Sequence, residues 1–293
     1  MKVFSIMNVS HHLNSVEICC IISVVNIAKE IGFFVNRDFI DFVEKQVSAS
    51  AKRVIRIDWQ NESFWVKSPE ETRVTIWHRL ASPLSTLIKN PLLRSTVASG
   101  GAEELLAEAA RIRLLHQKGM PVPEVVAQSD EWFVIRDGGR SIRGVLKDKT
   151  LSAADKLGIL QKVAAALGDI HARGGWHGRP ALRDILWDGE QVTFIDFEEN
   201  LAARLDPLLC QVRDLLLFTH SLFRLWGDAD YSRPVLNTYR DTAPVSVWEQ
   251  SIKEAQRLNW ACKLLKVARH VGGHDVVNAY LTLRFFSEYD KAS

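Results

Sequence analysis

Apolar residues that are all β-branched or aromatic cluster in two short segments that follow Arg53, a pattern typical of β-strands. The first segment is Val54–Ile57 and the second is Ser63–Lys67, with Asn61-Glu62 between them as a turn. The pattern therefore predicts a β-hairpin. Two further apolar runs, at 124–127 and 132–135, predict two more strands.

Between these pairs of strands the period changes to that of a helix. The apolar residues of the segment Ala102–Lys118 recur at helical spacing and fall largely on one face. Gly119 is suited to end this helix, and Pro121 and Pro123 prevent it from continuing. The segment Thr75–Leu93 also has a partly helical pattern, which prolines interrupt.

After Asp137-Gly138-Gly139, which predicts a flexible joint, the chain becomes mostly helical. Ser152 is a good N-cap for a long helix at 153–173, and Asp188-Gly189 predicts a hairpin turn between the short strands 185–187 and 192–195. We therefore predict an α+β fold with a small β-rich lobe (51–137), one main helix in that lobe, and a larger helical lobe (138–293). Residues 1–50 are expected to form a helical extension, broken near Asn36–Asp38. Ligands are expected to bind between the lobes, at the joint.

Composition narrows the function. The 293 residues are 47% hydrophobic and 25% charged, as in ordinary globular proteins, and 37 basic residues nearly balance 35 acidic ones. This balance gives no electrostatic footprint for duplex DNA. The four cysteines form no C-x-x-C pair, so neither a zinc finger nor a disulfide framework is expected. The apolar stretch Val16–Ala28 is too short to span a bilayer, and we expect a cytoplasmic protein.

Two carboxylates flank the second predicted hairpin. Asp184 comes just before its first strand and Asp196 just after its second, so the hairpin should bring both to the same end. Two such carboxylates suit Mg²⁺ that carries a nucleotide phosphate. The alternative is that both acids only cap turns and pair with Arg179 or Arg183.

The surrounding residues resemble protein kinases. His177-Gly178-Arg179-Pro180-Ala181-Leu182-Arg183-Asp184 resembles the kinase catalytic loop, in which His, a residue, Asp, four residues and Asn follow one another. Ile195-Asp196-Phe197-Glu198 resembles the metal-binding Asp-Phe-Gly segment. The run Gly119–Val125, after a helix, resembles bacterial lipopolysaccharide (Kdo) kinases, the kinase of the KEOPS complex and the RIO kinases. The likeness covers roughly Val54–Phe223.

This resemblance implies a protein-kinase-like fold with ATP and Mg²⁺ as cofactors, and it implies roles for individual residues. Lys67 would hold the α- and β-phosphates, and Glu108 would pair with Lys67, although Glu104 lies one turn away on the same face. Asp196 would be the principal metal ligand, and Asp184 stands at the metal-binding Asn. Asp214 would brace the catalytic loop, and His177 would support that loop more than act in the chemistry. Lys67 also fits an ordinary strand-end lysine.

Three departures from the kinase pattern bear on activity. Arg179 stands where the catalytic Asp belongs, and a guanidinium cannot accept a proton. A glycine-rich loop is missing before the first hairpin, and Glu198 replaces the glycine of Asp-Phe-Gly. The catalytic candidates are therefore His177, Arg179 and Asp184, with the substrate proton taken by Asp184, Glu198 or a substrate group.

Two hypotheses follow from this pattern. The first is an ATP- and Mg²⁺-dependent phosphotransferase whose hydroxyl acceptor is a sugar, a lipid-linked sugar or a protein Ser/Thr. The second is a pseudokinase, which would use the same fold to bind nucleotide or a protein partner, because Arg179 replaces the base.

Residues 247–270 interleave tryptophan and leucine with basic residues. Trp248, Trp260, Lys263, Lys266 and Arg269 fit a surface in peripheral contact with the inner face of a membrane. The same pattern also fits a helix with one core face and one solvated face.

Overall fold

The structure, a computed structural model, describes residues 37–69, 101–197, 205–226, 229–268 and 273–289. The chain divides into two compact units, residues 1–42 and 43–293. Helix α2 (Arg37–Ser48) begins where the sequence predicted a break. Residues 1–36, most of the predicted helical extension, and the segment Thr75–Leu93 lie outside the described residues.

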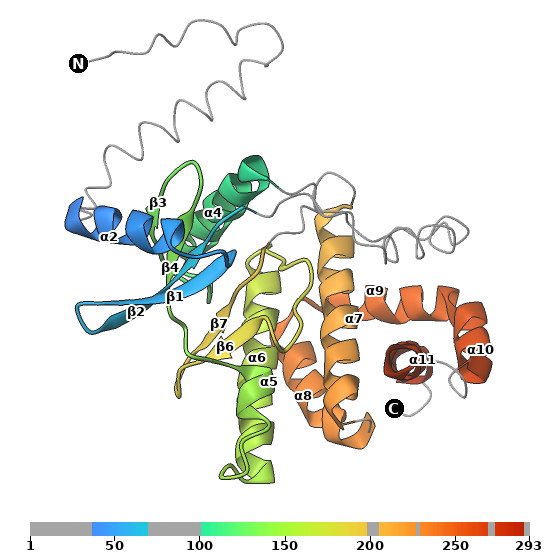
Figure 1. Cartoon of the computed structure of the whole chain (residues 1–293). Helices are drawn as coiled ribbons and strands as arrows, with labels where there is room; N and C mark the ends of the chain where they lie inside the picture. Colours follow the sequence, from blue (N-terminus) through green and yellow to red (C-terminus); the bar gives the residue numbers. More distant parts are fainter. Residues whose placement is uncertain (1–36, 70–100, 198–204, 227–228, 269–272, 290–293) are drawn as a thin grey trace, which may run out of the picture. The chain divides into compact units, whose positions relative to one another are not determined.

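The β-rich lobe is built as predicted, around one antiparallel sheet (Figure 1). Strands β1 (Val54–Trp59) and β2 (Glu62–Lys67) form the first hairpin, and β3 (Val125–Gln128) and β4 (Phe133–Arg136) form the other pair. The strand order is β1-β2-β4-β3, because β4 pairs with β2. Helix α4 (Ala102–Gln117) packs against β3 and β4.

The first hairpin turns one residue earlier than predicted. Trp59 pairs with Glu62, which makes Gln60 and Asn61 the two turn residues. Both have positive φ angles, 48° and 67°, as the favoured two-residue hairpin turn requires. Glu62 therefore belongs to the strand, not to the turn.

Helix α4 ends as the sequence predicted. The Gly119 N–H donates to the His116 carbonyl (2.8 Å), and the Met120 N–H donates to the Leu115 carbonyl (3.1 Å). Gly119 has a φ of 68°, so these bonds form a Schellman cap, which favours glycine.

The joint between the lobes is tightly packed. A Cβ on Gly139, whose φ is 94°, would lie 2.4 Å from the Trp187 carbonyl oxygen, so only glycine fits there. A Cβ on Gly138 would meet Leu186 and Thr193 at 3.0–3.1 Å. The joint backbone thus lies directly against the second hairpin.

The helical lobe begins with a small sheet. Strand β5 (Arg140–Ser141) pairs with β6 (Ile185–Trp187), which forms the predicted hairpin with β7 (Val192–Phe194). Short α5 (Ile142–Val145) contacts β5 and β6. Helix α6 (Ala153–Ala172) starts at a Ser152–Asp155 capping box, as its N-cap residue predicted.

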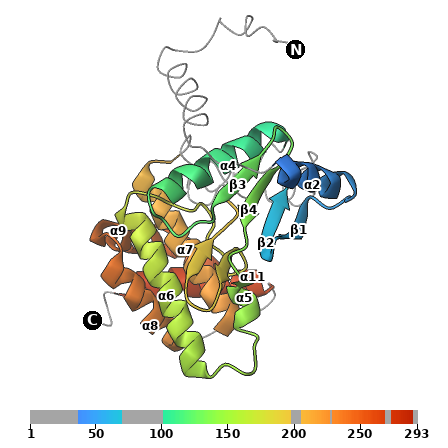
Figure 2. The same cartoon turned by 90° about the vertical axis from the view of Figure 1, so that its left-hand side faces the viewer.

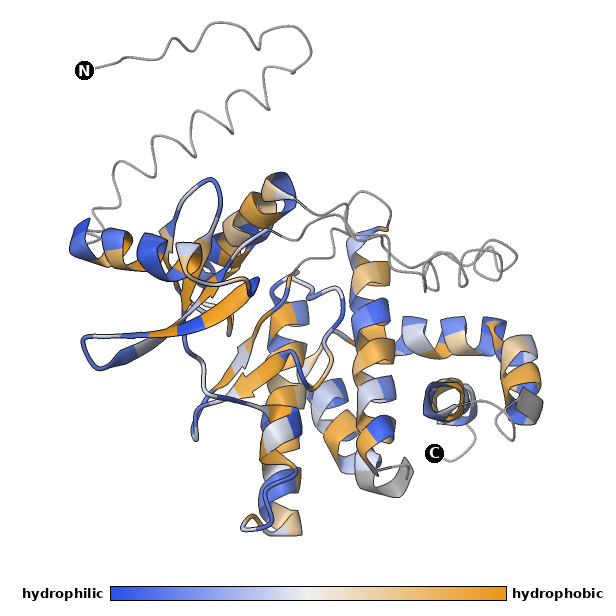
Figure 3. Cartoon of the chain, in the orientation of Figure 1, coloured by the Kyte–Doolittle hydropathy of each residue, from blue (hydrophilic) through white to orange (hydrophobic). Residues whose placement is uncertain are grey.

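Five further helices complete the described part of this lobe: α7 (Pro207–Trp226), α8 (Ala229–Thr242), α9 (Val245–Arg257), α10 (Asn259–Ala268) and α11 (His274–Glu288). Helix α6 packs on α8, and α7 packs on α9 and α11 (Figure 2). Hydrophobic residues concentrate in the strands and in α6 and α7, whereas α8 and α9 are more hydrophilic (Figure 3). None of the described helices is both long enough and apolar enough to cross a membrane.

Candidate active site

A lysine at the end of the first hairpin joins three elements of the fold. Lys67 Nζ lies 2.8 Å from the Glu108 carboxylate on α4 and 3.2 Å from Asp196 Oδ1, just after β7. Glu108 is only 4% exposed, because it lies on the face of α4 that packs inwards. Of the two glutamates that the sequence offered, the structure brings Glu108 to Lys67.

Asp214, from α7, holds the loop that precedes β6. It is fully buried, and it accepts hydrogen bonds from the backbone N–H groups of His177 and Gly178, the latter at 2.7 Å. His171 Nε2 lies 3.3 Å from the same carboxylate, and His171 Nδ1 contacts the Tyr239 hydroxyl at 2.6 Å. A buried carboxylate with several donors fixes the shape of a loop much more firmly than a solvated one would.

Both ring nitrogens of His177 form hydrogen bonds. Nδ1 accepts from the Arg179 N–H (3.2 Å), and Nε2 donates to the Ile195 carbonyl (2.9 Å). The ring also lies 4.5 Å from that of Phe197, and burial lowers the pKa of His177 to about 4. The ring is therefore neutral at pH 7, and neither nitrogen is available for a substrate proton.

This buried neutral histidine predicts a pH-dependent stability. An unfolded histidine titrates near 6.5, and the folded pKa is about 4, so the contribution is complete above pH 6.5 and is lost as pH falls from 6.5 to 4. The loss is on the order of 3 kcal/mol. We expect His177→Asn to be less stable at pH 7.5 and to lose this acid sensitivity. Urea unfolding at pH 7.5, 6 and 5 measures how the free energy of unfolding depends on pH. The exposed His274→Asn variant is the control, and equal pH slopes in wild type and His177→Asn would contradict the prediction.

Asp196 lies between two cations. Its Oδ1 faces Lys67, and its Oδ2 lies 3.2 Å from Arg179 Nη2. Burial acts to raise the pKa of Asp196, but the charges of Lys67 and Arg179 outweigh it and lower that pKa below its usual value. The backbone is left-handed here, with a φ of 72°, which is uncommon for a residue other than glycine and recurs at functional sites.

Asp184 lies at the same end of the hairpin. The Ile195 N–H donates to the Asp184 carbonyl (3.0 Å), directly beyond the Ile185–Phe194 pair, so the hairpin register brings the two acids together. Burial, and then the negative charge of Asp196, raise the pKa of Asp184. Arg183 Nε donates to its carboxylate at 3.2 Å.

These two acids fit Mg²⁺ in one particular way. The described residues contain no group of three His, Cys, Asp or Glu side chains suited to a metal. Mg²⁺ commonly binds through one or two carboxylates and completes its shell with phosphate oxygens and water. Asp184 and Asp196 therefore suit a metal that arrives with a phosphate, and this metal would compete with Arg179 for Asp196.

Arg111 belongs to the site, although the sequence analysis did not select it. Its guanidinium donates to the Trp176 carbonyl (2.8 Å) and lies 5.5 Å from the ring centres of both Trp176 and Phe197. It connects α4 to the loop and to the residue after Asp196. The available signal was its position, one turn after Glu108 on the same helix.

Two further expectations from the sequence concern Glu198 and a ligand site at the joint between the lobes. Glu198, a candidate for the substrate proton, lies outside the described residues. A cavity of about 610 Å³ borders the joint, with Asp137, Gly139 and Trp187 in its wall, but Lys67 and Asp196 do not line it.

The β-rich lobe has a small antiparallel sheet and one main helix, and glycines join it to the helical lobe. The hairpin of the helical lobe carries Asp184 and Asp196. This combination defines the protein-kinase-like class of fold. The predicted resemblance is thereby confirmed. Residues 53–245 match the sequence model of APH, the phosphotransferase enzyme family. Since this match covers more than half of the chain, the protein belongs to the phosphotransferase enzyme family.

The chain is also similar to the following proteins. An "uncharacterized protein" of Haemophilus influenzae is 29% identical over 254 residues, which span 86% of this chain and 97% of that protein. The structure "WaaP in complex with acyl carrier protein" covers 74% of this chain and 88% of its own, with 17% identity and a TM-score of 0.44. The gentamicin complex of APH(2")-IIa covers 85% and 96%, with 12% identity and a TM-score of 0.32.

Proposed function

We propose that this protein is an ATP- and Mg²⁺-dependent phosphotransferase acting on a hydroxyl acceptor, which is a sugar, a lipid-linked sugar or a protein Ser/Thr. One observation carries the proposal: Lys67 lies between the buried Glu108 and Asp196. A lysine held by a buried acid beside a second acid has its ammonium aimed at one place, which suits it to hold phosphates. The proposed location of the protein is the cytoplasm.

The other charged residues then have distinct tasks. Asp184 and Asp196 would hold Mg²⁺, which supplies neutralisation of phosphate charge when it is bound. With Asp196 engaged by the metal, the Arg179 guanidinium would be available to stabilise charge on the transferred phosphoryl group. Among the described residues, Asp184 is the candidate to accept the proton of the acceptor hydroxyl, because it is a carboxylate at the same end of the hairpin as Asp196. His177 keeps the loop in shape.

The second candidate function is a pseudokinase. Arg179 favours it, because this side chain replaces the usual base and forms an ion pair with Asp196 at 3.2 Å. A protein that used this ion pair permanently would bind nucleotide without transferring phosphate.

Calorimetric titration of the full chain with ATP, with and without Mg²⁺, tests the proposal. We expect Mg²⁺-dependent binding, and Lys67→Ala should weaken it about 10- to 100-fold, because one charge-assisted contact contributes roughly 1.5–3 kcal/mol. The exposed Lys52→Ala variant is the matched control. Failure of wild type to bind ATP under either condition would rule out the phosphotransferase and leave a pseudokinase that binds a protein partner. Binding without ATP turnover or phosphate transfer to any acceptor would favour the pseudokinase.

A further inference from the structure

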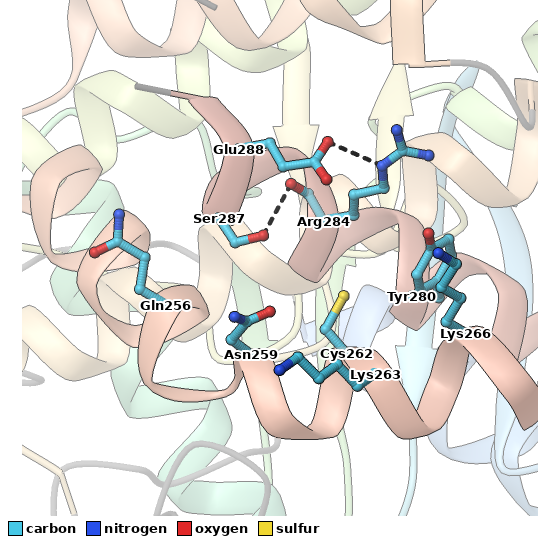
Figure 4. A pocket seen from close by; sticks show the side chains of 9 residues that line it. All are labelled: Gln256, Asn259, Cys262, Lys263, Lys266, Tyr280, Arg284, Ser287 and Glu288. Atoms are coloured by element: carbon cyan, nitrogen blue, oxygen red, sulfur yellow. Dashed lines mark hydrogen bonds and ion pairs between the residues drawn. The ribbon is translucent and has the colours of Figure 1, made fainter. Parts of the chain in front are cut away.

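A polar pocket lies where α10 faces α11 in the helical lobe (Figure 4). Its residues, 256–288, come much later in the sequence than Lys67 and Asp196. Its volume is about 370 Å³. The lining residues are mostly basic or hydrogen-bonding: Gln256, Asn259, Cys262, Lys263, Lys266, Tyr280, Arg284, Ser287 and Glu288. The proposed phosphotransferase reaction uses none of these side chains.

The charge of this pocket is positive. Arg284 and Glu288 neutralise each other through an ion pair of 2.9 Å, one turn apart on α11. Lys263 and Lys266 come from α10, and neither forms an ion pair with any residue that the structure describes. Two lysines, with hydroxyl and amide groups around them, suit a phosphate group rather than a cation or an apolar ligand.

Next to these lysines, α10 exposes two large apolar side chains. Trp260 is 49% exposed and Leu264 is 63% exposed. They stand one turn apart on the same helix, so they share a face, and Lys263 lies beside both along that surface. The other exposed large hydrophobic residues in the described part of the chain lie on separate elements: Val54, Leu114 and Val245.

We propose that α10 binds an anionic phospholipid headgroup at a membrane surface. Lys263 and Lys266 take the phosphate in the pocket, and Trp260 and Leu264 enter the interface between headgroups and acyl chains. Tryptophan is suited to that interface, because its ring is apolar and its N–H can stay hydrated. The proposal does not depend on the phosphotransferase function.

A protein partner explains the surface less well. The centres of protein–protein interfaces are depleted of lysine, whereas amphipathic helices at membranes combine Lys with Trp and Leu. On α10, Lys263 adjoins the exposed Trp260 and Leu264, and Lys266 lies one turn after Lys263 on the side that lines the pocket. The membrane surface is therefore the occupant that matches both the charge and the apolar pair.

Vesicle flotation with the full chain tests the proposal. We expect binding to vesicles of phosphatidylcholine with 30% phosphatidylglycerol, little binding to phosphatidylcholine alone, and weaker binding at high salt. Each lysine near an anionic surface changes partitioning about fivefold, so Lys263→Ala with Lys266→Ala should weaken binding about 30-fold. Trp260→Ser with Leu264→Ser should weaken it at least about tenfold. The exposed pair Lys147→Ala with Lys149→Ala is the matched control and should bind like wild type.

Several results would overturn the proposal. These are absence of wild-type binding to the anionic vesicles, or equal binding by the α10 variants and wild type. Binding of inorganic phosphate by calorimetry without vesicle binding would make the pocket a site for a soluble phosphate. Self-association that depends on Trp260, again without vesicle binding, would assign the face to a second copy of the chain. Thermal unfolding checks that each variant is folded. Titration of each variant with ATP shows whether nucleotide binding is unchanged when vesicle binding is weakened.

Discussion

Replacing Asp196 with alanine is expected to remove Mg²⁺-dependent nucleotide binding and to lower phosphoryl transfer by about 10³-fold or more. Asp196 is the acid shared by the lysine of the β-rich lobe and the arginine of the loop, at 3.2 Å from each. Its loss removes one of the two carboxylates that, among the described residues, could hold the metal at this end of the hairpin.

The same change should not abolish metal-free binding of ATP. Without Asp196, Lys67 and Arg179 lose their shared acid, so the local potential becomes more positive and the attraction for phosphates rises. Titration with ATP in EDTA and in Mg²⁺ therefore separates the two effects. We expect a higher affinity than wild type in EDTA and little gain when Mg²⁺ is added.

Asp196→Asn and Glu190→Ala complete this experiment. The asparagine keeps the size of the side chain but loses its charge, so it should behave like alanine towards Mg²⁺. Glu190 is an exposed acid at the tip of the same hairpin, and its removal should change neither binding nor turnover. A Mg²⁺ response in Asp196→Ala that equals the wild-type response would refute the metal role of Asp196.

The second large effect is expected on stability. Asp214→Ala should lower the free energy of unfolding by about 3–5 kcal/mol, because it leaves buried donors without an acceptor. The donors are the backbone N–H groups of His177 and Gly178, and His171 lies beside them. A domain has only about 5–15 kcal/mol of stability in total, so the variant should be close to unfolding at 37 °C.

Urea unfolding measures this loss, with the exposed Asp130→Ala variant as the control. Asp214→Asn should be intermediate, since one amide oxygen can accept a hydrogen bond while the amide NH₂ faces a second donor. A loss below about 1 kcal/mol for Asp214→Ala would show that the loop keeps its shape without the aspartate.

Much of this architecture could be predicted from the sequence, because the signals were local. The two hairpins, the end of α4 at Gly119 and the start of α6 at Ser152 follow from turn and capping residues. The convergence of Asp184 and Asp196 followed from a single hairpin turn between them. The family resemblance, which the match over residues 53–245 confirms, rested on the order of these same motifs.

The rest depended on contacts that are distant in the sequence. The two-residue strand β5 is too short to have a period, and its existence depends on pairing with β6. Arg111 was missed because a long, flexible side chain on a helix reveals its partners only after Trp176 and Phe197 are in place.

The tryptophans of residues 247–270 show the same limit. Trp248 is buried and packs against Phe286, whereas Trp260 is half exposed. The two tryptophans differ in this way because they lie on different helices: α9 ends at Arg257 and α10 begins at Asn259.

The close packing at Gly138 and Gly139 has a mechanical consequence. Since the joint backbone lies against Trp187, Leu186 and Thr193 with no space for even one extra carbon, it cannot slide over the second hairpin. In a hinge movement between the lobes, the hairpin must therefore move together with the joint. Asp184 and Asp196 lie at one end of this hairpin, so opening or closing the lobes would move both carboxylates together.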